Sequence, residues 1–178
     1  MSPRLHLRAL WVALLAVGFS TLACAGSPAP LSLTQLSRKA GFIFSGRVIR
    51  VERPALASGK ATVMQVTLRV ERALRGTHPG ETFTLREWMG AWDSGPQFRV
   101  GQRVLLFLYP RSKAGLTSVV GGRLGQFDLD TQGNIVLRGD QQRLLLGPDD
   151  TATGPARATR PPRLRYRDFA GRVQRVEP

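Results

Sequence analysis

Apolar residues recur at every second position in several successive segments of this chain. The clearest segment covers residues 61–74, in which one face carries Met64, Val66, Leu68 and Val70. A period of two places alternate side chains on opposite faces of an extended strand, so the pattern predicts a half-buried β-strand. Residues 42–51 and 81–87 show the same alternation. Three such segments joined by short, turn-rich connections favour an antiparallel sheet.

Residues 103–109 form a continuous apolar run that ends at Pro110. A run of this length predicts a strand that is covered on both faces. Shorter strand-like segments follow at residues 116–120, 126–129 and 135–138, separated by turns rich in Gly, Asp and Asn. No crossover helices separate the predicted strands. The sequence therefore predicts a mainly β fold, a small closed or partly open antiparallel barrel of the OB type, over residues 31–146.

Two short helices are expected at the ends of this barrel. Residues 31–40 allow a helix with Ser32 as its N-cap, closed by Gly41. Residues 166–177 allow an amphipathic helix, because its apolar residues follow helical spacing at Phe169, Val173 and Val176. Residues 147–165 contain few large apolar side chains, so a disordered basic linker is predicted there.

The first 25 residues have the order of regions found in an export signal. Arg4 and Arg8 precede an uncharged apolar run over residues 9–19, and small residues follow it. The run is about half of the roughly 20 residues that a membrane-spanning helix needs. Two outcomes remain open, because cleavage before Gly26 competes with lipid attachment at Cys24, whose preceding residues resemble a lipobox. Either outcome predicts an exported protein that is periplasmic, envelope-associated or secreted.

Charge suggests what such a protein binds. The chain has 26 lysines and arginines against 12 aspartates and glutamates, a formal net charge of +14. An excess of this size indicates an anionic polymer as a possible partner, and the predicted partner is a protein or an anionic polymer of the cell envelope, with membrane attachment through Cys24 as a further possibility. Export argues against nucleic acid as a partner. One candidate basic patch consists of Arg157, Arg160, Arg163, Arg165 and Arg167.

Aromatic residues around the Gly- and Pro-containing segment after residue 88 form a second candidate site. Rigid amphipathic side chains of this kind dominate many binding interfaces. The predicted binding residues are Trp88, Met89, Trp92, Phe98 and Arg99. The alternative is that the aromatic residues close one end of the barrel. Whether nearby arginines flank this segment depends on the fold, and the arginines concerned are Arg86, Arg99, Arg103 and Arg123.

Catalytic and metal-ligating residues are scarce. One Cys and two His exclude an internal disulfide and a Cys/His zinc site. His78 falls in a turn without an evident nucleophile beside it. Asp128, Asp130, Gln132 and Asn134 alternate as calcium ligands do, but the closing acid is missing, so a hairpin turn is preferred. We expect no cofactor, no metal and no catalytic residues, and we retain an envelope-associated hydrolase or its accessory factor as the alternative function.

Three motifs follow the predicted short helix within residues 31–146, namely Phe42, Gly46 and Val48, then Val70 to Gly76, then Phe98, Gly101, Leu105, Phe107 and Leu108. Their order resembles that of exported bacterial proteins of unassigned function. It is also similar to the order in the OB barrel of netrins and tissue inhibitors of metalloproteinases. The resemblance implies a five-stranded Greek-key barrel with flanking helices, and partner binding in place of catalysis.

The animal inhibitors of that family chelate an enzyme's zinc through a free N-terminal Cys within a Cys-x-Cys motif. This chain has Cys24, Ala25 and Gly26 at the corresponding place and no second Cys, so protease inhibition is not implied. The expected function is therefore that of a non-catalytic exported envelope protein that binds a protein or an anionic polymer through loops of a small barrel.

Overall fold

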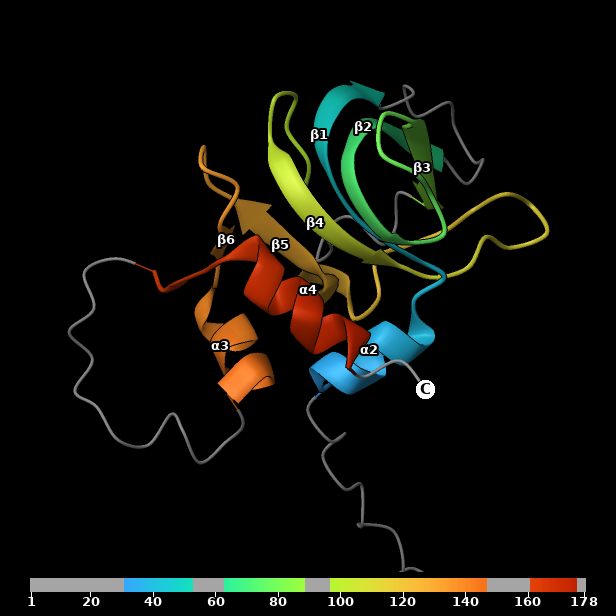
Figure 1. Cartoon of the computed structure of the whole chain (residues 1–178). Helices are drawn as coiled ribbons and strands as arrows, with labels where there is room; N and C mark the ends of the chain where they lie inside the picture. Colours follow the sequence, from blue (N-terminus) through green and yellow to red (C-terminus); the bar gives the residue numbers. More distant parts are fainter. Residues whose placement is uncertain (1–30, 53–62, 89–96, 147–160, 176–178) are drawn as a thin grey trace, which may run out of the picture. The chain divides into compact units, whose positions relative to one another are not determined.

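Seven strands form one antiparallel sheet in the computed structural model, which describes residues 31–52, 63–88, 97–146 and 161–175 (Figure 1). The spatial order of the strands is β3-β2-β1-β4-β5-β6-β7. The elements in chain order are α2 (Leu33–Lys39), β1 (Phe42–Glu52), β2 (Val63–Arg75), β3 (Thr82–Trp88), β4 (Arg103–Leu108), the 3₁₀ helix η2 (Gly122–Gly125), β5 (Gln126–Leu129), β6 (Ile135–Val136), α3 (Gly139–Leu146), β7 (Arg163–Leu164) and α4 (Tyr166–Gln174).

The first four strands form a Greek key, because β4 returns to lie beside β1 after the β1-β2-β3 meander. Register shifts in β1 against β2 mark bulges, which bend and twist a sheet. One bulge lies at Gly46, where an added Cβ would come 2.6 Å from the carbonyl oxygen of Arg69. Only glycine therefore allows these two strands to approach so closely.

The mainly β antiparallel fold is confirmed, and the sheet is not closed within the described residues, so of the two predicted forms, closed or partly open, the closed one is not observed. Strands β3 and β7 are the two edges. Residues 117–120 lie between the outer edge of β3 and the end of β4. The Thr117 N–H donates to the Arg86 carbonyl at 2.9 Å, and the Val120 N–H donates to the Phe107 carbonyl at 2.8 Å. The strand predicted over residues 116–120 reduces to a single bridge between Leu108 and Val119.

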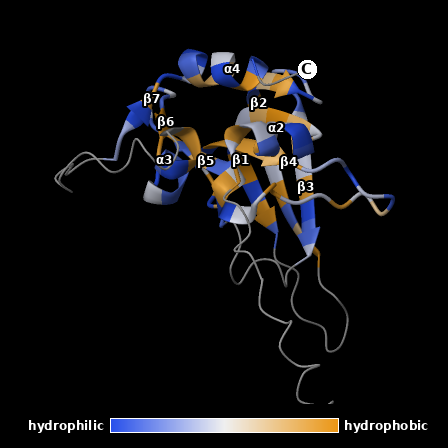
Figure 2. Ribbon diagram, turned by 90° about the horizontal axis from the view of Figure 1, so that it is seen from below, coloured by the Kyte–Doolittle hydropathy of each residue, from blue (hydrophilic) through white to orange (hydrophobic). Residues whose placement is uncertain are grey.

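Strand β4 is buried on both faces, as its continuous apolar run predicts. Val104, Leu106 and Leu108 belong to one hydrophobic cluster, which fills the inside of the curled β1–β4 sheet. Leu105 and Phe107 belong to a second cluster, which also holds apolar residues of α2 and α4. Figure 2 shows hydrophobic residues concentrated on the central strands, with hydrophilic residues on the outward turns of α4. The two clusters fix β4 as the centre of the fold.

Helix α2 begins where the sequence predicts. The Ser32 Oγ accepts the Gln35 N–H at 3.2 Å, and the Gln35 Oε1 accepts the Ser32 N–H at 3.1 Å, forming a capping box. The helix does not end at Gly41 through a left-handed residue, because its C-cap is Ala40 in an extended conformation. A Cβ at Gly41 would instead meet the Pro110 backbone at 2.8 Å. Close approach, and not helix capping, accounts for this glycine.

Residues 139–146 and 163–164 form regular secondary structure that the sequence does not predict. The buried Gln141 side chain holds helix α3 against β5 by donating to the Gln126 carbonyl at 2.7 Å. The linker predicted over residues 147–165 is wrong at its end, because Arg163 and Leu164 form β7 against β6, whereas residues 147–160 lie outside the described residues.

Helix α4 confirms the predicted C-terminal helix and completes the second hydrophobic cluster. Phe169 is fully buried, and its ring lies 5.1 Å from that of Phe127 and 6.1 Å from that of Phe107, centre to centre. Val173 is buried beside it in the same cluster. The C-terminal helix is therefore part of the core of the domain.

Candidate anion-binding site

Three arginines stand side by side across three neighbouring strands. Arg47 on β1 is the register partner of Arg69 on β2 and, on its other side, of Arg103 on β4. Register partners share a face of the sheet, and this face is the one turned away from the first hydrophobic cluster. The Arg47 side chain is 53% exposed and the Arg103 side chain 22% exposed. We call Arg47, Arg69 and Arg103 the arginine row.

A single carboxylate neutralises part of this row. The Glu71 Oε2 accepts hydrogen bonds from the Arg103 Nη2 at 2.6 Å and the Arg103 Nε at 2.9 Å, and its Oε1 lies 3.7 Å from the Arg47 Nε. Glu71 has no register partner, because the bulge in β2 pairs Val70 with Gly46 and Arg72 with Ser45. The backbone bends at a bulge and changes the direction of the extra residue's side chain, which here directs the Glu71 carboxylate towards Arg47 and Arg103.

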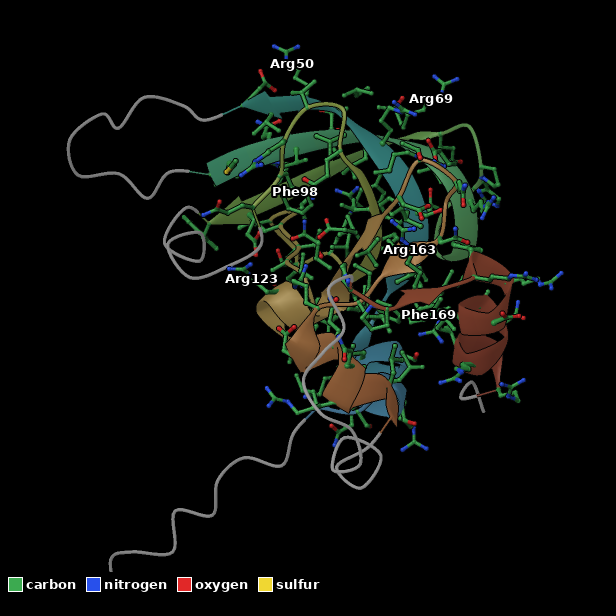
Figure 3. The ribbon with its side chains drawn as sticks, turned by 90° about the vertical axis from the view of Figure 1, so that its left-hand side faces the viewer. Arg50, Arg69, Phe98, Arg123, Arg163 and Phe169 are labelled. Carbon is green, nitrogen blue, oxygen red and sulfur yellow. The ribbon has the colours of Figure 1, made fainter. Side chains whose placement is uncertain are left out.

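Two more arginines lie near the row, Arg72 on β2 and Arg163 on β7. The Arg72 guanidinium lies 4.6 Å from the centre of the Tyr166 ring, a cation–π contact that joins β2 to α4. Burial raises the pKa of the Tyr166 hydroxyl, so the ring is neutral at physiological pH. The Arg163 Nε lies 3.5 Å from the Asp130 Oδ2. In Figure 3, Arg69 and Arg50 project outwards from the upper part of the sheet, and Arg163 lies below them.

The carboxylate of Asp130 organises the turn beside these arginines. Its Oδ1 accepts the backbone N–H groups of Asn134 at 2.9 Å and Gln132 at 3.0 Å. These hydrogen bonds, with that of Asn134 as the largest contribution, and the nearby Arg163 hold the pKa of Asp130 below its ordinary value. Asp130 therefore stays ionised and serves the turn, which agrees with the predicted hairpin and leaves its oxygens already engaged.

Two polar cavities continue from the row. The first, of about 470 Å³, is lined by Arg47 and Arg103 together with Gly101, Gln102, Asp128, Leu129, Asp130 and Thr131. The second, of about 380 Å³, shares Gln102 and Asp128 with the first and is also lined by Gln97, Arg99, Arg123, Gln126 and Arg138. The shared residues make the two cavities neighbours, and we call them together the polar trough.

Charge in the polar trough is unevenly balanced. The Arg138 Nη1 lies 3.3 Å from the Asp128 Oδ2, and the Arg138 Nη2 donates to the Gln126 carbonyl at 2.9 Å and to the carbonyl of Arg123. Arg138 thus neutralises the Asp128 carboxylate and links η2 to β5 through its hydrogen bonds to their carbonyl groups. The guanidinium groups of Arg99 and Arg123 are exposed and make no hydrogen bond or ion pair with other residues of the described segments. The net charge of the residues that line the trough is therefore positive.

The predicted binding residues Trp88, Phe98 and Arg99 lie in different environments. Phe98 is only 2% exposed and belongs to the first hydrophobic cluster, so it is not a surface contact. Arg99 lines the trough, and Trp88 is 50% exposed at the end of β3. Met89 and Trp92 lie outside the described residues, as does Cys24. Whether Arg86, Arg99, Arg103 and Arg123 flank the aromatic segment stays a prediction, because residues 89–96 lie outside the described residues; Arg99, Arg103 and Arg123 line the trough.

The predicted basic patch is not one continuous segment of linker. Arg163 lies in β7 and pairs with Asp130, and the Arg167 Nε lies 3.5 Å from the Asp168 Oδ1 in α4. Arg165 is the exposed N-cap of α4. Arg157 and Arg160 lie outside the described residues. Sequence reasoning missed Arg47, Arg69 and Glu71 as site residues, because only the register of the strands brings them together.

His78 forms a local contact in an exposed turn. Its Nδ1 lies 3.2 Å from the Glu81 Oε1, and the Thr77 hydroxyl donates to the Glu81 Oε2 at 2.7 Å. The Thr77 and His78 hydrogen bonds lower the pKa of Glu81. The hydroxyl bonds to the carboxylate and not to the imidazole, so this turn does not form a nucleophile–base pair. No group of three or more His, Cys, Asp or Glu side chains suited to a metal ion occurs among the described residues.

Comparison with known families finds no family model that matches this chain, and comparison with curated proteins finds no match. Within the segments that the structure describes, no helix is long and apolar enough to cross a membrane.

Proposed function

We propose that this chain is a non-catalytic exported protein that binds an anionic polymer of the cell envelope along the arginine row and the polar trough. The observation that carries the proposal is the register that places Arg69, Arg47 and Arg103 side by side. Like charges directly opposite each other on neighbouring strands destabilise a sheet. Glu71 compensates only part of that cost, so a polyanion that supplies further negative charge explains the arrangement.

The trough extends the surface beyond the row. Arg47 and Arg103 line its first cavity, and Arg99 and Arg123 line its second. A ligand with repeated negative charges can contact both sets of arginines at once, whereas a single small anion cannot. Export rests on the signal-like residues 1–25, and attachment through a lipidated Cys24 is one form of it.

The strand order also supports an OB-like interpretation of the fold. Strands β1–β4 form a Greek key, and residues 117–120 bridge β3 and β4 through backbone hydrogen bonds where a regular barrel would have a closing strand. On this proposal, the domain is an open relative of the small binding barrels, and partner binding is the activity that such a scaffold most often carries.

The experiment compares two double variants with the same change in charge. Heparin serves as the anionic probe, and affinity is measured over a range of salt concentrations. Arg47→Gln/Arg69→Gln removes two exposed charges of the row, and Arg38→Gln/Arg143→Gln removes two exposed charges from α2 and α3. Each phosphate-like contact contributes about 0.7 to the slope of log K against log salt. We expect the row variant to lower the slope by about 1.4, and the helix variant to change it little.

Equal losses in the two variants would mean that only total charge matters and would overturn the assignment to the row. If the full-length protein does not bind heparin at low salt, the proposal of an anionic polymer as ligand is overturned, and a neutral protein partner is the surviving alternative.

A further inference from the structure

A separate cavity lies at the opposite end of β4 from Arg103. It has a volume of about 320 Å³ and is lined by the end of β3, by the residues that follow β4 and by residues 116–118. Ligand-binding cavities begin at about 300 Å³, so this one has room for one compact group. Its walls include Glu87, Trp88, Tyr109, Ser112, Thr117 and Ser118.

Exposed aromatic surface is concentrated at this cavity. Trp88 is 50% exposed and Tyr109 37% exposed, and both belong to the small set of large hydrophobic side chains that are exposed in the described segments. The other two members, Ile49 and Val100, do not line the cavity. Aromatic rings with a polar atom at one end bind groups that are apolar on one side and wet on the other. The C–H face of a sugar ring, bordered by hydroxyl groups, is such a group.

Polar atoms of the same walls suit hydroxyl groups. The Glu87 side chain, only 5% exposed, contributes carboxylate oxygens that accept hydrogen bonds. The Ser112 Oγ accepts the Leu116 N–H at 3.1 Å and keeps its own proton for donation. The Thr117 hydroxyl donates to the Tyr109 carbonyl at 2.6 Å and thereby fixes the wall. A ligand that both donates and accepts matches this mixture better than one that only donates or only accepts.

The charge at the cavity argues against an anionic ligand. Among the residues that line it, Glu87 is the one whose side chain is charged at neutral pH, and a carboxylate repels an anion. We propose that this cavity binds one uncharged sugar ring of a polysaccharide, stacked on Trp88 and Tyr109, independently of the arginine row.

Calorimetric titration of the full-length protein tests this assignment. The probes are the uncharged tetrasaccharides chitotetraose, cellotetraose and maltotetraose. We expect at least one of them to bind, with an affinity that is nearly independent of salt. Trp88→Ala should weaken that binding about tenfold, because stacking and burial of the indole are lost. Trp88→Phe, which keeps a smaller ring, should weaken it less, and Glu87→Gln should also weaken it.

Val100→Ala is the matched control, since it trims another exposed apolar side chain that does not line the cavity. Circular dichroism verifies that each variant is folded, and Trp88→Phe keeps the test decisive if Trp88→Ala does not fold. Binding of none of the three tetrasaccharides, or equal binding by Trp88→Ala, would overturn the sugar site. Saturable binding of tetramethylammonium in place of the sugars would replace it with a cation site. Heparin affinity should be the same in all these variants, so a failure here is distinct from a failure of the arginine row.

Discussion

Replacing Glu71 with Gln should lower the stability of the fold and at the same time tighten its binding to a polyanion. Glu71 is the carboxylate that bonds Arg103 and approaches Arg47 within the arginine row. Glutamine has nearly the same shape but no charge. The substitution therefore leaves three register-paired arginines without their counter-charge, while the surface gains one unit of net positive charge.

The loss of stability follows from two contributions. A hydrogen bond between charged groups contributes about 1.5–3 kcal/mol, and the low end applies because the Gln oxygen still accepts one bond from Arg103 and the site is partly exposed. Unscreened repulsion between like charges on neighbouring strands adds roughly 0.2–1 kcal/mol. We expect Glu71→Gln to lower the free energy of unfolding by about 2 kcal/mol at low salt, as measured by urea denaturation. Added salt should reduce the difference, because it screens the repulsion.

The gain in binding is measured with heparin. Arg103 no longer has its charge neutralised by a carboxylate and can pair with the polymer, so the slope of log K against log salt should steepen by about 0.7. Binding to the folded state should also restore part of the lost stability when heparin is present during unfolding.

Glu52→Gln provides the control for this prediction. Glu52 pairs with Arg50 at 2.7 Å at the exposed end of β1, and both side chains are substantially exposed. Its loss changes the net charge equally but should cost less than about 1 kcal/mol, as exposed ion pairs do. The reasoning is refuted if Glu71→Gln binds heparin no more tightly than Glu52→Gln, or if the two variants are equally stable.

Two further substitutions test the core and the turn beside the site. Phe169→Ala should lower the free energy of unfolding by about 3–5 kcal/mol, because it removes the ring that packs against Phe107 and Phe127 and leaves a cavity. Arg167→Ala, at an exposed position of the same helix, should lower it little. A loss under about 1 kcal/mol for Phe169→Ala in urea denaturation would mean that α4 is not part of the core. The lowered pKa of Asp130 stabilises the folded state at pH values above the unfolded pKa, and this contribution is lost as the pH falls through the folded pKa. Asp130→Asn should therefore be less stable than the wild type at neutral pH and should lose less stability on acidification, and identical pH profiles of urea denaturation would contradict the role of this carboxylate.

Local pattern in the sequence predicts the parts of the fold that are decided locally. The period-two alternation around Leu68 predicts β2, because neighbouring side chains of a strand always point to opposite faces. Ser32 predicts the start of α2, since its side chain bonds to the backbone three residues later. The continuous run at residues 103–109 predicts a doubly covered β4. In each case, the residues that determine the structure lie within a few positions of one another.

Tertiary structure alone decides how far the sheet closes and what its outer face carries. Helix α3 has only a weak apolar pattern, and its position depends on a hydrogen bond from the Gln141 side chain to the Gln126 carbonyl. Arg47, Arg69 and Arg103 are spread over β1, β2 and β4, and a shift of one residue in either pairing would turn them to opposite faces. The sequence determines that this chain is basic and builds its domain from antiparallel strands. Strand register, set by bulges and by the packing of both hydrophobic clusters, determines where that charge is gathered, because it depends on contacts between residues far apart in the chain.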